Sequence, residues 1–87
     1  MPTVWIPSLM QRLPGGQAQV EMEGATVREI IATLEAAFPG FKERICENDR
    51  IRSSLSVAVD GEISTEGMRR KVGTSSEVHF LPALAGG

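Results

Sequence analysis

Cysteine, histidine and tryptophan each occur only once in this sequence of 87 residues, and these scarcities exclude several classes of protein. The single cysteine, Cys46, allows no internal disulfide, so the chain fits a reducing compartment. A lone histidine, His79, supports neither a metal site nor a catalytic triad. Gly15-Gly16 lacks the lysine and the spacing of a phosphate-binding loop. We therefore expect no self-contained active site, no bound metal or cofactor, and a protein that is not itself an enzyme.

Long apolar runs and a basic excess are missing as well. No segment approaches the roughly 20 apolar residues of a transmembrane helix, and residues 1–6 lack the features of a signal peptide. A cytoplasmic location without membrane contact is the default expectation. The formal net charge is -2, which argues against nucleic acid as a partner. The cluster Arg69-Arg70-Lys71 is interpreted as a solvated turn, with contact to an acidic partner surface as the alternative.

The sequence does contain the pattern of one small globular domain, with 41% apolar and 23% charged residues. Alternation over residues 3–7 predicts a strand with Val4 and Ile6 on one face and Trp5 on the other. Turn residues at 13–16 connect it to a second alternating segment, residues 17–23. The two segments are predicted to form a hairpin.

A helix is predicted after Gly24, which ends the second strand. Thr26 and Glu29 form a capping-box pattern. The apolar residues that follow lie at helical spacing: Val27, Ile30, Ile31, Leu34 and Phe38. Pro39-Gly40 ends this helix, and residues 41–46 form a short second helix with Phe41 and Ile45 facing inward.

The second half of the chain returns to strands. Residues 47–50 are predicted as a polar loop, and alternation over residues 54–59 predicts a third strand. Asp60-Gly61 is a tight-turn signal leading into a short strand at 62–65, and residues 66–74 are expected to be irregular. The last strand is predicted at 78–81, with Pro82 stopping its pairing. This order indicates an α+β domain of the β-grasp type over residues 1–82, with the first and last strands parallel at the centre of the sheet.

The end of the chain is the most informative segment. Residues 83–87 are predicted to be a flexible tail, and they are small or apolar without a charge, whereas an ordinary solvated tail is polar. Glycine has no Cβ, so Gly86-Gly87 lets the backbone enter a narrow channel and leaves the terminal carbonyl uncrowded. The predicted reactive group is the Gly87 carboxylate. Adenylation by ATP on a partner enzyme would let a sulfur nucleophile convert it to a thiocarboxylate.

With these features the sequence resembles the ubiquitin-like sulfur carriers. This family includes the molybdopterin synthase small subunit, the thiamine-pathway carrier and the carrier for cysteine biosynthesis. The resemblance spans nearly the whole chain, and its most specific block is residues 78–87. Further anchors are Val4-Trp5-Ile6-Pro7, Gly15-Gly16-Gln17, Gly24-Ala25-Thr26-Val27 and Leu34-Glu35. Ile6-Pro7 and Gly15-Gly16-Gln17 are most similar to the cysteine-type carriers.

The resemblance implies a protein-bound sulfur donor that is monomeric when free. Its partners would be an E1-like adenylating or sulfurtransferase enzyme, which uses the ATP, and a sulfur-accepting synthase. The tail that would enter the partner's channel is Pro82, Ala83, Leu84, Ala85 and Gly86. Cysteine, molybdopterin, thiolated tRNA and a secondary metabolite all remain open as the product. A protein modifier joined to lysines through Gly87 needs the same activated tail and is the main alternative, beside a β-grasp binding module.

The alternation of the strands also predicts a surface for docking a partner. Trp5, Ala58 and Leu81 are expected to share the face turned away from the helix, next to the tail. Exposed apolar patches often mark partner sites, and tryptophan is a frequent hot-spot residue. His79 is expected at a solvent-facing strand position. Cys46 is expected to be partly buried and structural.

Overall fold

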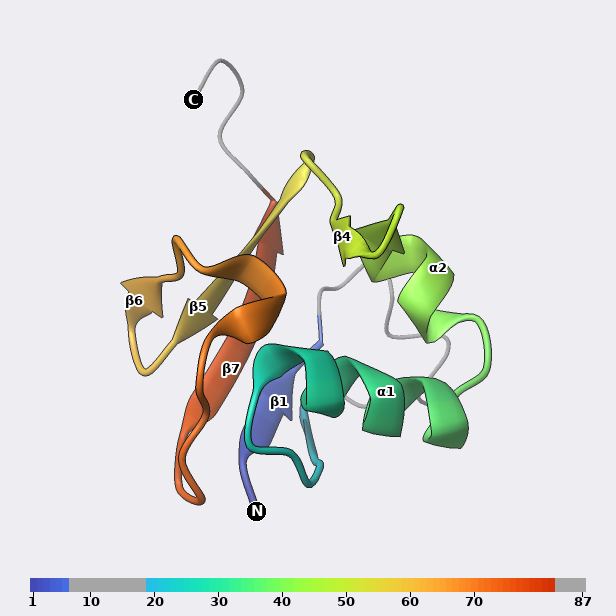
Figure 1. Cartoon of the computed structure of the whole chain (residues 1–87). Coiled ribbons are helices and arrows are strands. Elements are labelled where there is room, and N and C mark those ends of the chain that lie inside the picture. Colours follow the sequence, from blue (N-terminus) through green and yellow to red (C-terminus); the bar gives the residue numbers. More distant parts are fainter. Residues whose placement is uncertain (7–18, 83–87) are drawn as a thin grey trace.

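The computed structural model of the protein describes residues 1–6 and 19–82 (Figure 1). Within these ranges it contains strands, two α-helices and one 3₁₀ helix, η2. Their bounds are β1 (Thr3–Trp5), β2 (Gln19–Glu21), α1 (Val27–Ala37), α2 (Phe41–Ile45), β3 (Cys46–Glu47), β4 (Arg50–Ile51), β5 (Leu55–Val59), β6 (Glu62–Ile63), η2 (Gly67–Arg69) and β7 (Glu77–Pro82). No helix in these ranges is both long and apolar enough to cross a membrane.

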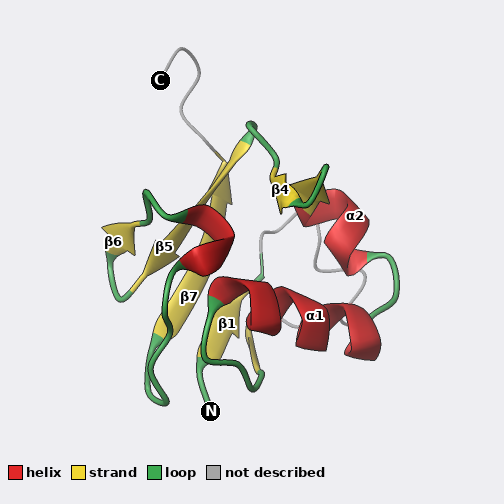
Figure 2. Ribbon diagram, viewed as in Figure 1, coloured by secondary structure: helices red, strands yellow, loops and turns green. Residues whose placement is uncertain are grey.

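The main sheet has five strands in the order β2-β1-β7-β5-β6. β1 is antiparallel to β2 and parallel to β7, so the first and last strands lie side by side near the centre. Figure 2 shows this sheet with α1 crossing in front of β1. The predicted β-grasp arrangement is confirmed, including the central parallel pair. The proposed boundary between domain and tail, at residues 82 and 83, stays a prediction because residues 83–87 lie outside the described part.

The core fills the space between the sheet and the helices. The helical stripe predicted from the sequence is buried at Val27, Ile30, Ile31 and Leu34, while Phe38 is half-buried at the end of α1. On the sheet side the core includes Val4, Val57, Val59, Val78 and Phe80. Phe41 and Ile45 of α2 are fully buried, as predicted, and the Phe41 ring meets Phe80 edge-on at 6.4 Å between centroids.

The start of α1 is fixed by side-chain hydrogen bonds. The Glu29 amide donates to Thr26 Oγ1 over 3.3 Å, which confirms the predicted N-cap. The Glu29 carboxylate accepts from the Ala25 amide, one residue before the cap, over 3.1 Å. Backbone hydrogen bonds to residues 70–72 also hold the segment around Thr26. The Val27 amide donates to Arg70 O, and the Val72 amide donates to Ala25 O.

Glu35 fixes the corner between the two helices. Its Oε1 accepts hydrogen bonds from the Lys42 amide at 2.9 Å and the Gly40 amide at 3.2 Å. These two bonds, of which the one from Lys42 has the larger effect, hold the pKa of Glu35 below its usual range. A carboxylate at the exposed amides of a helix start stabilises the turn that brings Phe41 into the core.

Three segments differ from the sequence expectations. Residues 47–50, expected to be a polar loop, form a tight hairpin turn. Asn48 and Asp49 both have positive φ, and the strands on either side of them, β3 and β4, pair with each other. The stretch 66–74, expected to be irregular, contains η2 and a bridge between Thr26 and Lys71. β7 extends to Pro82, which pairs with Leu55, so the pairing does not stop before the proline. Pro7 and residues 17–18 of the predicted hairpin, and its turn at 13–16, lie outside the described residues.

Candidate functional site

The last described residue, Pro82, lies where β7 leaves the sheet. Its Cα partner is Leu55, the first residue of β5, so β7 ends beside the start of β5. The predicted tail residues Ala83, Leu84, Ala85, Gly86 and Gly87 lie outside the described residues. The structure therefore does not place the Gly87 carboxyl group, and the site assigned to it stays a prediction.

One row of side chains crosses the outer face of the whole sheet. The strand registers place Trp5 beside Gln19 on one side and beside His79 on the other. His79 is in turn opposite Ala58, and Ala58 is opposite Ile63. Because side chains in register on neighbouring strands point to the same face, these residues form a continuous line across β2, β1, β7, β5 and β6.

The centre of this row is an aromatic pair. The Trp5 indole and the His79 imidazole are stacked, with centroids 5.3 Å apart and planes 8° apart. Trp5 is 36% exposed and Leu81, two residues after His79 on the same strand face, is 38% exposed. The predicted outward orientation of Trp5 and Leu81 is confirmed. The two residues lie on neighbouring strands and lead toward the end of β7.

Ala58 lies on the outer face, as predicted, but it adds almost no exposed area to that face. Its side chain is only 5% exposed, although its register places it between His79 and Ile63 on the outer face. A methyl group flanked on both sides by larger side chains is covered by them. Ala58 therefore lies in the row without contributing to its exposed surface.

The sequence did not identify Ile63 as a member of this face, nor the contact that His79 makes on it. Ile63 is 56% exposed, and the Asp60-Gly61 turn would have placed it opposite Ala58, since a two-residue loop fixes the register of both strands. His79 was predicted to face solvent, but its stacking on Trp5 depends on the parallel pairing of β1 with β7. We define the outer patch as Trp5, His79, Ile63 and Leu81.

A hydrogen-bond network around the buried residue Ser76 connects the turn after β5 to the start of β7. The Ser76 hydroxyl donates to Asp60 Oδ2 over 2.8 Å and the Glu77 amide donates to Asp60 Oδ1 over 3.0 Å. Ser76 Oγ also accepts from the Gly73 amide over 2.8 Å. The bond from Glu77, followed by that from Ser76, lowers the pKa of Asp60. The turn after β5 is thereby tied to the start of β7.

The remaining candidate residues do not form a site in the described ranges. The Cys46 side chain is 7% exposed, its Sγ lies 3.9 Å from Met68 Sδ, and burial raises its pKa. Its predicted structural position is thus supported. The described residues hold no group of three or more His, Cys, Asp and Glu side chains arranged to bind a metal ion.

The central parallel pair and the helix across one sheet face define a ubiquitin-like β-grasp protein. A sequence profile of the ThiS family matches residues 4–87, and the chain belongs to this family. The resemblance to ubiquitin-like sulfur carriers seen in the sequence is confirmed.

Individual relatives agree with this assignment. The chain is 30% identical over 90 residues to a protein named sulfur carrier protein CysO of Mycobacterium tuberculosis, covering 98% of this chain and 97% of that one. The crystal structure of an Amycolatopsis orientalis BexX/CysO complex contains a similar chain, with a TM-score of 0.92, 34% identity and full coverage of both chains. The small archaeal modifier protein 1 of Methanosarcina acetivorans has a TM-score of 0.80 at 20% identity, covering 99% of this chain and 95% of its own, and shares the fold.

Proposed function

We propose that this protein is a sulfur carrier for the biosynthesis of cysteine or another sulfur-containing metabolite. The observation that supports this most directly is the similarity to the CysO sulfur carrier, which extends over 98% of this chain and 97% of the relative. The family match extends to Gly87, so it covers the di-glycine end of this chain. The working group would be the carboxylate of Gly87.

The chemistry takes place in two steps on a partner enzyme. The Gly87 carboxylate attacks the α-phosphate of ATP, pyrophosphate leaves, and an acyl adenylate forms. A sulfide nucleophile then attacks the Gly87 carbonyl, and AMP leaves with the bonding electron pair. The product is a thiocarboxylate, whose anionic sulfur is the nucleophile passed to the acceptor. ATP belongs to the partner, and this chain acts as a co-substrate without catalytic residues of its own.

The outer patch supports this function as a docking surface for the activating enzyme. Leu81 directly precedes Pro82 on β7, and Trp5 lies on the neighbouring parallel strand β1, so a partner seated on them would be next to the start of the tail. Pro82, Ala83, Leu84, Ala85 and Gly86 would then span the distance to the nucleotide. The two small terminal residues suit a narrow channel because they carry no side chain. An E1-like adenylating enzyme is the partner we propose for this surface.

The experiment combines the protein with ATP, a sulfide source and an E1-like enzyme from the same organism. Intact-protein mass spectrometry should show replacement of one oxygen by sulfur, and fragmentation should place it at Gly87. A variant with one alanine added after Gly87 is the matched control and should remain unmodified. An unchanged mass in the folded wild-type protein with its cognate enzyme would contradict the proposal.

Mass spectrometry of the protein isolated from cells distinguishes a sulfur donor from a modifier that is conjugated to other proteins. A free thiocarboxylate supports the carrier function, whereas branched peptides joining Gly87 to lysine side chains indicate a protein modifier. Sulfur transfer from the loaded protein to a cysteine precursor or to a molybdopterin precursor, each with its synthase, distinguishes the cysteine pathway from a molybdopterin synthase small subunit.

A further inference from the structure

The edge of the sheet formed by β2 is separate from the outer patch and from the tail. β2 is the terminal strand in the order β2-β1-β7-β5-β6, so within the described residues it has a sheet neighbour on one side only. Its three residues are Gln19, Val20 and Glu21. Edge strands present a row of backbone donors and acceptors that can pair with another chain.

The hydrogen-bond pattern shows which backbone groups face that edge. The Met22 amide donates to Pro2 O over 3.1 Å, so Met22 belongs to a hydrogen-bonded pair of the antiparallel ladder. Such pairs alternate with non-bonded ones. Val20 therefore also bonds to β1, whereas the N–H and C=O groups of Gln19 and Glu21 point away from β1. The Thr3 amide, opposite Glu21, donates to Ser76 O on the other side, which agrees with this alternation.

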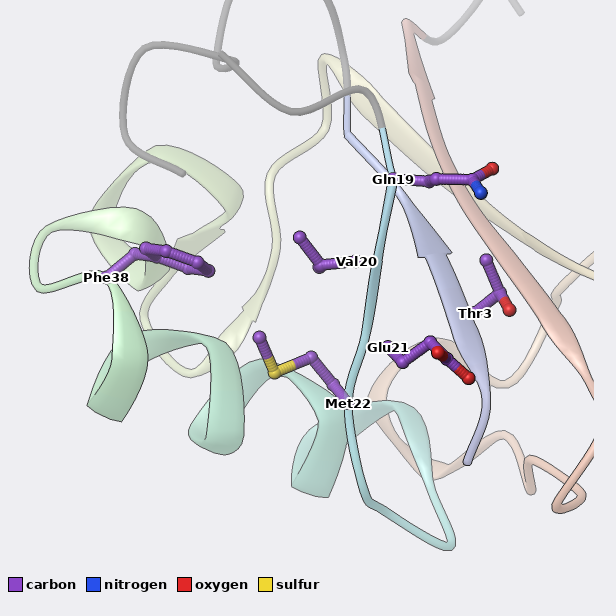
Figure 3. A pocket seen from close by; sticks show the side chains of 6 residues that line it. All are labelled: Thr3, Gln19, Val20, Glu21, Met22 and Phe38. Atoms are coloured by element: carbon purple, nitrogen blue, oxygen red, sulfur yellow. The ribbon is translucent and has the colours of Figure 1, made fainter. Parts of the chain in front are cut away.

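An open cleft of about 660 Å³ follows this edge. Figure 3 shows Val20 and Met22 directed to the side of β2 on which Phe38 lies, and Gln19 and Glu21 directed to the other side, where Thr3 lies on β1. Val20 belongs to the core cluster, against which Met22 and Phe38 pack while staying half-buried. A chain lying along β2 would thus find an apolar strip on one side and polar groups on the other.

The polar side of the cleft is acidic. Thr3 lies between Glu21 on β2 and Glu77 on β7, and both glutamates are exposed. The described segments 1–6, 19–27 and 72–82, which include β1, β2 and β7, contain no lysine or arginine. On β7, the His79 Nε2 atom lies 3.7 Å from Glu77 Oε1. Glu21, the glutamate that lines the cleft, makes no ion pair within the described residues.

We infer that the β2 edge binds an extended segment of a partner protein in which apolar side chains alternate with lysine or arginine. The segment adds to the sheet as a further strand through the outward N–H and C=O groups of Gln19 and Glu21. Its apolar side chains meet Val20, Met22 and Phe38, and its cations meet Glu21. A second copy of the chain fits poorly, because pairing two β2 strands would offer Glu21 no cation, since residues 19–27 contain no lysine or arginine.

The first experiment titrates ¹⁵N-labelled protein with an end-blocked heptapeptide that alternates lysine and valine. Chemical-shift changes should centre on residues 19–22 and Phe38, and amide exchange at Gln19 and Glu21 should slow. Glu21→Lys should weaken binding by about fivefold, which corresponds to loss of one exposed ion pair and its replacement by repulsion. Glu66→Lys, the same charge change at an exposed residue outside the cleft, should leave the affinity near that of wild type.

The second experiment tests the backbone pairing. The same peptide N-methylated at alternate residues, so that it lacks the amides facing β2, should lose most of its affinity. Equal binding of the methylated peptide, or shift changes centred away from β2, overturns the proposal. Concentration-dependent shifts at β2 without peptide would assign the edge to a second copy and would also overturn it. Gly87 takes no part in these measurements, so they are independent of the proposed sulfur chemistry.

Discussion

Trp5 and His79 are stacked partners on the two central parallel strands, with ring centroids 5.3 Å apart. This contact joins residues from the two ends of the chain on the exposed face of the sheet. The stacking restrains the indole in one orientation while leaving 36% of Trp5 exposed. A large, partly immobilised aromatic surface loses little entropy on binding, which suits a docking anchor.

Removing the anchors of the outer patch should weaken binding to the activating enzyme. Trp5→Ala and Leu81→Glu should each reduce affinity by more than about 1 kcal/mol, measured by calorimetry. Trp5→Ala should also destabilise the fold by about 1 kcal/mol because the stacking on His79 is lost. Ala36→Glu, on the exposed face of α1, is the control and should bind normally. Unchanged affinity of both patch variants would reject this surface.

Gly24 is predicted to tolerate no larger residue. A Cβ there would lie 2.8 Å from the Ile30 backbone nitrogen and 2.9 Å from Ile30 Cδ1. Gly24→Ala should therefore lower the free energy of unfolding by about 1–3 kcal/mol in denaturant titrations. Adding Ile30→Val relieves only the contact with Cδ1, so the steric penalty of the alanine should be reduced but not abolished. A fully stable Gly24→Ala protein would contradict the close approach.

Asp60 should make stability depend on pH. Its pKa is lower in the folded protein than in the unfolded chain, so its stabilising contribution is complete above the unfolded pKa of about 4 and is lost as the pH falls through the folded value. Asp60→Asn should be less stable than wild type at pH 7, and the difference should narrow in acid. Thermal unfolding over a pH series measures this. Glu66→Gln is the control and should show the same dependence of stability on pH as the wild type. A stability difference between Asp60→Asn and wild type that stays constant over the pH series would contradict the role of the network.

The sequence was sufficient for the features that depend on local pattern. The apolar stripe of α1, the Thr26 cap and the Asp60-Gly61 turn follow from residue spacing and turn chemistry. The β-grasp pattern that these elements form predicted the central parallel pair of the first and last strands. Gly24 was predicted to end a strand, and its second role beside Ile30 depends on a packing distance that no local pattern contains. The hairpin turn at Asn48 and Asp49 was missed because neither residue is a glycine, although both take positive φ.

The candidate site shows the same division. Alternation along each strand correctly predicted that Trp5 and Leu81 point outward. It could not show that Ala58 is covered, because that depends on the size of its cross-strand neighbours, His79 and Ile63. The stacking of Trp5 on His79 requires the register of two strands separated by most of the chain. The Gly87 chemistry was inferred from the tail sequence and the family resemblance, and it stays a prediction.

The burial of Cys46 provides a direct test of the sulfur chemistry. Its side chain is 7% exposed and burial raises its pKa, so the folded protein should react slowly with iodoacetamide. A thiocarboxylate at Gly87 would be anionic at neutral pH and should be alkylated first. Protein loaded by the activating enzyme should therefore gain one label at Gly87 under native conditions, whereas unloaded protein gains none. The Cys46→Ala variant should, like the wild-type protein, gain one label when loaded and none when unloaded. Rapid native labelling at Cys46 would contradict its burial without affecting the assignment of Gly87.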